Sequence, residues 1–339
     1  MVDNLLASKQ YNSIDLFKFI FAFAVISIHT QPLINCSTNV VININEAIIR
    51  MAVPFYFIAS GYLLGQRISF ENNNYNPHVF EKYLLRILKM YIIWMLIYSP
   101  LAIINYIKTG TSFIKAVGSF LIGLFFVGEQ YNNWVLWYLL STIYAVLLIW
   151  LISRRGLRKR HLIGLVILAS IMVAGFGYIG NSSDYNGALG IFQKVVRRVL
   201  SSGRIFNGLV YIPIGLLLSK HKMHVAFCWI LFLLGFIGRV FVTNSIAVTY
   251  LLIASSIGLF GLIARIQLSD SKMYMAFRNM STTIYLIHLL VWTGYYMSVY
   301  GTKTYGLDCF VVVSIVSTMI AYGYYWMNQR KNNKLLISS

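Results

Sequence analysis

The chain of 339 residues is 58% hydrophobic and 11% charged, and its mean hydropathy is +0.70. These values exclude an ordinary soluble domain and predict an integral membrane protein. Basic loops that adhere to anionic lipid explain the formal net charge of +19 better than nucleic-acid binding, which we do not expect.

Apolar stretches of about 20 residues recur along the chain, and none shows the alternating pattern of a membrane β-strand. We therefore expect an all-α, polytopic bundle of about ten transmembrane helices, organised as a single domain over residues 1–339. The short apolar segment 112–127 is interpreted as interfacial, with a re-entrant segment or a further span as alternatives. The predicted spans lie near 14–34, 47–66, 84–107, 133–152, 162–180, 205–220, 224–243, 247–266, 281–300 and 308–328.

Lysine and arginine residues are concentrated in the second, fourth and sixth connections and in the C-terminal tail. This distribution predicts that the even-numbered loops and both termini are cytoplasmic. The connection 181–204 breaks the pattern, because it falls outside in this count yet contains four basic residues. It is either an external amphipathic helix or a sign that one span is miscounted.

The first predicted span contains two ionisable residues, Lys18 and His29, that fall on nearly the same helical face. Eleven positions are about three turns, or roughly 16 Å along the axis. Such side chains are costly in hydrocarbon unless they line a cavity or are paired, which makes them candidates for function, with Asp15 as an ion partner of Lys18. The alternatives are a buried hydrogen-bonding His29, a snorkelling Lys18 and an Asp15 that stabilises the helix N-terminus.

Five motifs, the first of which contains Lys18 and His29, occur along the chain and resemble motifs of the membrane acyltransferase type 3 family. Within that family, the branch that this chain resembles most is the membrane domain of vancomycin-resistance serine racemases. We expect no racemase activity, because no soluble racemase domain follows within the 339 residues. The motifs are Ile14–Lys18 with His29 and Thr30, Val53–Tyr62, Arg86–Lys89, Leu136–Leu139 and Ser281–His288.

Three positions depart from the family pattern. Lys18 stands where Arg is frequent, which keeps the charge but loses bidentate binding of anions. Val135 stands where many members have His, and Leu289 replaces the usual Pro. These departures affect the choice of substrate more than the family assignment.

The resemblance implies transfer of an acyl group, usually acetyl, from acyl-CoA to a hydroxyl of an envelope glycan or lipid-linked saccharide at the bacterial cytoplasmic membrane. His29 is the candidate general base or covalent acyl carrier. Lys18 is a candidate for orienting the site or binding donor phosphates, and Asp15 for holding Lys18. Acyl-CoA is the expected co-substrate, and we expect no tightly bound cofactor and no metal.

Further residues are candidates for binding. Arg86 and Lys89 lie one turn apart and can bind donor phosphates, although positive-inside topology explains them equally well. The candidates for substrate binding are Ser60, Tyr62, Trp137, Tyr285 and His288, and for the first three helix packing is a serious alternative.

Two other functions remain open from the sequence. An ion-lined helical path serves a transporter, for example of serine, as readily as acyl transfer. A transporter is expected to show interrupted helices in matching halves, and the sequence contains no convincing internal repeat. The third hypothesis, besides an acyltransferase and a transporter, is an inactive or regulatory membrane module.

Overall fold

A computed structural model describes the backbone of residues 11–68, 77–301 and 305–337, with side chains as far as residue 330. Helices dominate this part of the chain, and it contains no strand, which confirms the all-α fold class. The contacts divide the chain into two compact units. Unit 1 comprises Met1–Asn35 and Leu259–Ser339, and unit 2 comprises Cys36–Gly258.

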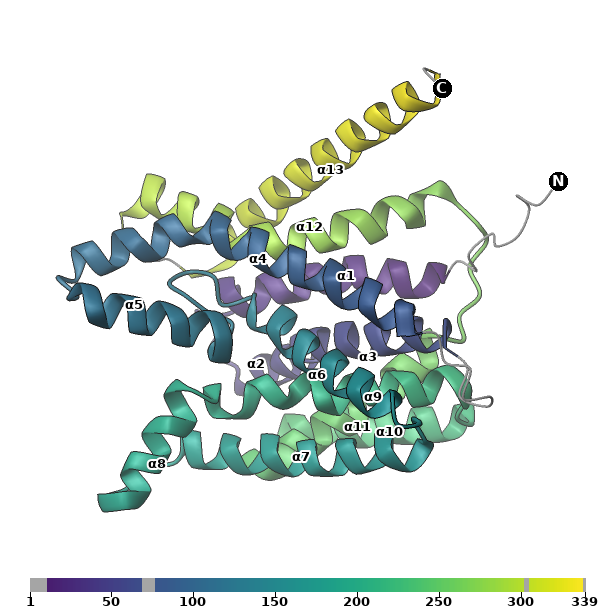
Figure 1. Ribbon diagram of the computed structural model, residues 1–339, viewed down its shortest axis with the longest axis horizontal. Coiled ribbons are helices and arrows are strands. Elements are labelled where there is room, and N and C mark those ends of the chain that lie inside the picture. The colour runs from purple at the N-terminus through teal and green to yellow at the C-terminus, as the bar shows by residue number, and fades with distance from the viewer. Residues whose placement is uncertain (1–10, 69–76, 302–304, 338–339) are drawn as a thin grey trace. The chain divides into compact units, whose positions relative to one another are not determined.

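Unit 1 joins the two ends of the chain. Helix α1 (Asn12–Thr30) packs against α12 (Lys272–Tyr295), which continues into a π-helical turn, η3 (Tyr296–Tyr300), and α13 (Leu307–Ile337) packs against both helices. Figure 1 shows α1 and α12 side by side, with the C-terminal end of α13 projecting away from α12. The rings of Phe19 and Phe277 stack at 4.4 Å, and the backbone amide of Gly306 donates to the carbonyl of Thr30. The first contact joins α1 to α12, and the second joins the end of α1 to the residue that precedes α13.

Unit 2 contains the intervening helices, and α3 and α9 lie at its centre. These two approach so closely that a Cβ atom on Gly61 would lie 2.1 Å from the carbonyl oxygen of Ile212, and one on Gly215 would lie 2.1 Å from that of Ile58. Close contact through small residues is typical of membrane helices, because lipid provides no hydrophobic drive for association. The elements are α2 (Asn39–Ile49), α3 (Ala52–Gly65), α4 (Pro77–Lys108), α5 (Phe113–Ile122), η1 (Gly123–Val127), α6 (Trp137–Ser153), α7 (Lys159–Asn181), α8 (Gly187–Arg198), η2 (Ser201–Phe206), α9 (Asn207–Lys220), α10 (Val225–Phe241) and α11 (Ser245–Ile263), whose last turn belongs to unit 1.

Each of the ten predicted spans coincides with a helix. Within the described residues, seven helical stretches are long and apolar enough to cross a membrane, and they overlap the predicted spans near 14–34, 47–66, 84–107, 162–180, 205–220, 247–266 and 308–328. The predicted spans near 14–34, 47–66 and 247–266 run one to four residues past the ends of these helices. Two predicted spans are shorter apolar helices, α6 and α10, and the span near 281–300 falls on α12 and η3. The segment 112–127, predicted to be interfacial, is also a short apolar helix, formed by α5 and η1, and its place in the membrane stays a prediction. The sidedness of the loops stays a prediction.

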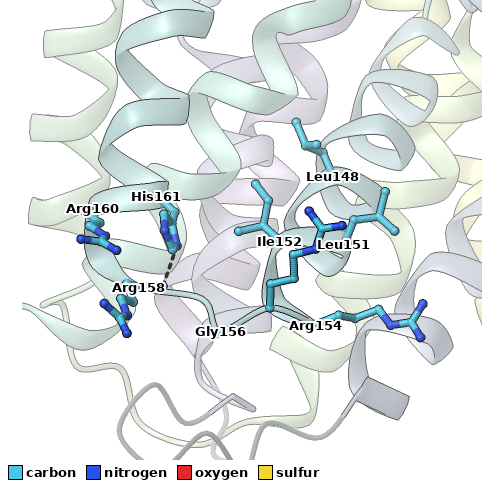
Figure 2. Close-up of a pocket in the computed structure, with 9 residues that line it drawn as sticks. Leu148, Leu151, Ile152, Arg154, Gly156, Arg158, Arg160 and His161 are labelled. Carbon is cyan, nitrogen blue, oxygen red and sulfur yellow. Dashed lines mark hydrogen bonds between the residues drawn. The ribbon is translucent and has the colours of Figure 1, made fainter.

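The turn between α6 and α7 surrounds a pocket of about 870 Å³. Figure 2 shows Leu148 and Leu151 on the α6 side and Arg158 and Arg160 at the start of α7. The backbone amide of Arg158 donates to Nδ1 of His161, which caps the first turn of α7. The pocket therefore has one apolar wall and one basic wall.

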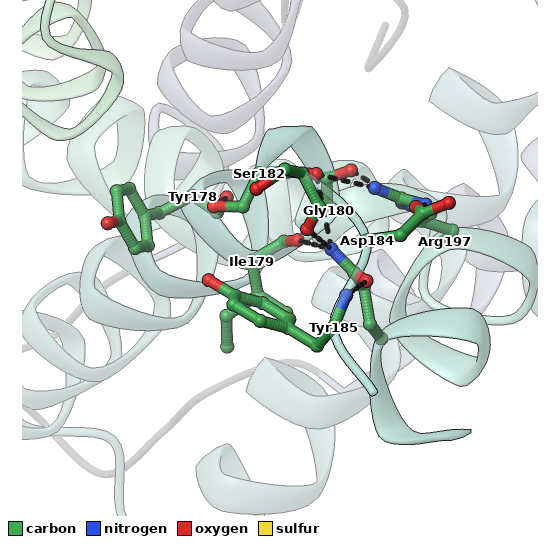
Figure 3. Close-up of polar contacts among 9 residues, drawn as sticks. Tyr178, Ile179, Gly180, Ser182, Asp184, Tyr185 and Arg197 are labelled. Carbon is green, nitrogen blue, oxygen red and sulfur yellow. Dashed lines mark hydrogen bonds and ion pairs between the residues drawn. The ribbon is translucent and has the colours of Figure 1, made fainter. Parts of the chain in front are cut away.

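At the opposite end of α7, polar side chains of α8 bind the last turn of α7 and the residues that follow it (Figure 3). The side-chain amide of Gln193 donates to the carbonyls of Ile179, Ser182 and Ser183. Arg197 donates to the carbonyl of Gly180 and forms an ion pair with Asp184. The carbonyls of Ile179 and Gly180 belong to the last turn of α7, where a helix leaves carbonyls without partners. The carbonyls of Ser182 and Ser183 belong to the segment that follows the helix. A helix, α8, does form within 181–204, where an external amphipathic helix was one of two alternatives, and the side of the membrane on which it lies stays a prediction.

Candidate active site

An ion pair connects the beginnings of the two main helices of unit 1. Nε and Nη2 of Arg278 donate to the same carboxylate oxygen of Asp15, at 2.9 and 2.6 Å. Asp15 is only 2% exposed, whereas the Arg278 side chain is 44% exposed. The side-chain amide of Asn12 adds a hydrogen bond of 2.9 Å to Asp270, just before α12. Polar contacts therefore fix the register of α1 against α12.

Towards the other end of α1, His29 lies beside His288 of α12. Their ring centroids are 5.3 Å apart, and the planes are inclined by 37°. His288 is fully buried, while His29 is partly exposed. The two histidines were separate candidates in the sequence, and the structure brings them together.

The hydrogen bonding of His288 defines the roles of its two ring nitrogens. Nδ1 lies 3.2 Å from the carbonyl oxygen of Ile284, which can only accept, so Nδ1 carries the proton. In the neutral ring, Nε2 is therefore an acceptor. It has no hydrogen-bond partner within the described part of the chain, although it is buried. A buried acceptor without a partner is costly in a folded protein and is suited to receive a donor from substrate or from a neighbouring ring.

Lys18 and Tyr285 complete the candidates in unit 1. Lys18 lies on α1 between Asp15 and His29, as the sequence indicated. Tyr285 is 5% exposed, and its ring centroid lies 6.4 Å from that of His288. All five candidates of this unit therefore occupy the paired helices α1 and α12.

The remaining candidates belong to unit 2. Ser60 Oγ of α3 and Tyr138 Oη of α6 are 3.1 Å apart, so a hydrogen bond joins these two helices. The Tyr83 phenol of α4 also hydrogen-bonds to Ser60, and the guanidinium of Arg86 lies 5.1 Å from the centre of the Tyr83 ring. Tyr62 lies two residues beyond Ser60 on α3 and is partly buried. Ser60 thus connects three helices of unit 2.

Arg86 and Lys89 are both exposed on α4. Their exposure leaves them accessible to an anion from solution, which is compatible with the predicted role in phosphate binding. Within the described residues there is no group of three His, Cys, Asp or Glu side chains placed to hold a metal ion.

Trp137 begins α6 and belongs to a buried polar region that the sequence did not reveal. The guanidinium of Arg204 lies 5.6 Å from the centre of its indole ring and forms an ion pair of 2.6 Å with Glu129. Burial raises the pKa of the Glu129 carboxyl above its ordinary value, and the charge of Arg204 opposes this shift. The neighbouring Asn133 is fully buried. The loop before α6 is therefore held by polar contacts in addition to the packing of its buried apolar residues Val135 and Leu136.

The sequence also did not identify Arg278 as the partner of Asp15. A signal was present, since Arg278 is an isolated basic residue close to the long apolar segment that ends in the Tyr285–His288 motif. By contrast, Arg50 and Glu46 form an ion pair of 2.6 Å within a single helical turn, at a spacing of four residues that is visible in the sequence.

Comparison with known proteins gives a family match over most of the chain. A family model described as an acyltransferase domain matches residues 11–326. Two amino-acid racemases of Enterococcus faecalis are 29% and 27% identical to the chain over 59% and 63% of its length, but the matches cover only 32% and 28% of those proteins. A serine/alanine racemase of Enterococcus gallinarum is 32% identical over 36% of this chain and 17% of that protein. The chain thus spans at most about a third of these relatives. No solved structure matches it.

Proposed function

The chain belongs to the acyltransferase type 3 family, and from this we propose that it is a membrane O-acyltransferase acting on the cell envelope. The proposed reaction moves an acetyl group from acetyl-CoA to a hydroxyl group of an envelope saccharide or lipid-linked sugar. The proposed location is the bacterial cytoplasmic membrane, with both termini in the cytoplasm.

The observation that carries the proposal is the placement of His29 beside His288, at 5.3 Å between ring centroids. Acyl transfer to an alcohol needs a group that removes the hydroxyl proton, and imidazole does this near neutral pH. We assign that role to His29. As the hydroxyl oxygen attacks the thioester carbonyl, a C–O bond forms, the C–S bond breaks, and His29 delivers the proton to the departing CoA thiolate.

We assign His288 to orienting His29. Its Nδ1 is held by the carbonyl of Ile284, so Nε2 is left to accept a hydrogen bond. If one ring nitrogen of His29 donates to this atom, its other nitrogen is unprotonated and can act as a base. His29 as a covalent acyl carrier is the second route, in which the same unprotonated nitrogen attacks the thioester first.

The binding roles follow from charge. We propose that Arg86 and Lys89 of unit 2 contact the phosphates of the donor, because lysine and arginine are the usual partners of phosphate. Tyr285, which lies next to His288 in unit 1, is proposed to contact the acceptor sugar. The curated relatives do not favour the transport alternative, since their names describe racemases and the matched regions are a minor part of them.

The test is transfer of radiolabelled acetyl from acetyl-CoA into extractable envelope material by membranes that contain the protein. We expect His29→Ala to reduce labelling by about 10²- to 10⁴-fold, the usual contribution of a general base. His288→Gln should lower kcat while leaving KM for acetyl-CoA nearly unchanged. The matched control is His221→Ala, because His221 is an exposed histidine in the connection after α9.

Two results would contradict the proposal. One is full labelling by His29→Ala at equal protein abundance. The other is no labelling by the wild type across several acyl-CoA donors with envelope acceptor present.

A further inference from the structure

The pocket at the α6–α7 turn is separate from every residue that we assign to acyl transfer. Its apolar wall is formed by Leu148, Leu151 and Ile152, from the last turns of α6. Arginines from the turn and from the start of α7 form its other wall, as Figure 2 shows for Arg158 and Arg160. A volume of about 870 Å³ lies within the range of roughly 300–1,000 Å³ that is typical of ligand pockets.

The basic wall is not neutralised by the protein. Four arginines line the pocket, and no aspartate or glutamate does. Among the described residues, none of these arginines forms an ion pair with a carboxylate. The start of α7, a helix of 23 residues, adds the positive end of a helix dipole at the same place. The charge of the pocket therefore favours binding of an anion.

The apolar wall restricts which anion fits. Leu148, Leu151 and Ile152 belong to an apolar helix, so they lie where lipid chains would meet the protein. A free phosphate compound makes no use of such a wall, whereas a phospholipid has a phosphate and a hydrocarbon chain in the same arrangement. Basic pockets between membrane helices are known to bind anionic headgroups.

We propose that this pocket binds one anionic phospholipid. The phosphate contacts Arg155, Arg158 and Arg160, and an acyl chain lies along Leu148 and Leu151. The arginines of the α6–α7 turn thus act as a lipid site as well as a topology signal. The proposal does not depend on acyl transfer.

The test measures binding of phosphatidylglycerol to the full-length protein in uncharged detergent, by native mass spectrometry. Phosphatidylcholine with the same chains serves as the neutral lipid. We expect one saturable phosphatidylglycerol per chain in the wild type. The double variant Arg155→Gln/Arg160→Gln should lose roughly 20- to 30-fold in affinity, because each basic residue near the surface contributes about a factor of five.

The matched control is Lys222→Gln/Lys272→Gln, which removes the same charge from two exposed lysines outside the pocket. It should bind as the wild type does. Arg155→Lys/Arg160→Lys, which retains the charge, should recover most of the affinity, and this separates loss of binding from loss of folding.

Three outcomes would overturn the proposal: equal affinity for phosphatidylcholine, unchanged binding by the glutamine double variant, or equal loss in the lysine control. Competition experiments distinguish a bound phospholipid from a bound soluble phosphate compound. Glycerophosphoglycerol, which lacks chains, and coenzyme A should both fail to displace the lipid. Displacement by either one would show that the pocket holds a soluble phosphate compound.

Discussion

Removing Arg278 gives the sharpest test of how α1 is held against α12. Asp15 is 2% exposed and receives both of its described side-chain hydrogen bonds from Arg278, so Arg278→Ala leaves a buried carboxylate without its partner. Breaking a buried pair in this way costs about 3–5 kcal/mol. Asp15→Asn leaves the other partner, which is 44% exposed and can be hydrated. We expect that variant to lose only about 1–2 kcal/mol.

The double variant distinguishes a charge effect from simple loss of contacts. Asp15→Asn/Arg278→Ala contains no unpaired buried charge, so it should be about 2 kcal/mol more stable than Arg278→Ala alone. The assay is thermal unfolding of the purified protein in detergent, with unfolding in denaturant to obtain free energies. The reasoning would be refuted by wild-type stability of Arg278→Ala, or by a double variant whose loss equals the sum of the single losses.

Three further variants test packing and hydrogen bonding in unit 2. Gly61→Ala should lower the free energy of unfolding by about 1–3 kcal/mol, because its methyl group meets the backbone of α9. Gly118 has open space around it, so Gly118→Ala should leave the stability unchanged in the same unfolding assay. Equal effects of the two substitutions would disprove the close approach of α3 and α9. Gln193→Ala should increase hydrogen exchange of the residues that join α7 to α8, and exchange should stay unchanged in Lys194→Ala, an exposed neighbour. Tyr138→Phe should cost about 1 kcal/mol, and unchanged stability would show that its hydroxyl bond adds nothing.

The helices could be predicted from the sequence because a long apolar segment in a membrane has few structures open to it other than a helix. It could not predict which helices are neighbours. His29 and His288 are 5.3 Å apart at the ring centroids, yet neither spacing nor composition relates residues so distant in the chain. Arg278 was overlooked for a similar reason, because the predicted span began at residue 281 and left it in the preceding connection.

The connection 181–204 shows how charge counting can mislead. Arg197 is engaged with Asp184 and with carbonyls of α7, and Arg204 is engaged with Glu129. These two arginines have local structural partners, so they carry less information on topology than unpaired basic residues do. The count of positive charges treated all basic residues as equivalent, and only the structure separates them.

Unit 1 is built from the two ends of the chain, and this sets an order of events during synthesis. Asp15 and Arg278 are 263 residues apart, and the whole of unit 2 lies between His29 and His288 in the sequence. At roughly 5–20 residues per second, on the order of 15 to 50 seconds pass between the emergence of the two partners. During that time the first helix holds a carboxylate and a histidine in the membrane before α12 exists. A nascent chain stalled after residue 258 would therefore present α1 to the quality-control machinery without its partner helix.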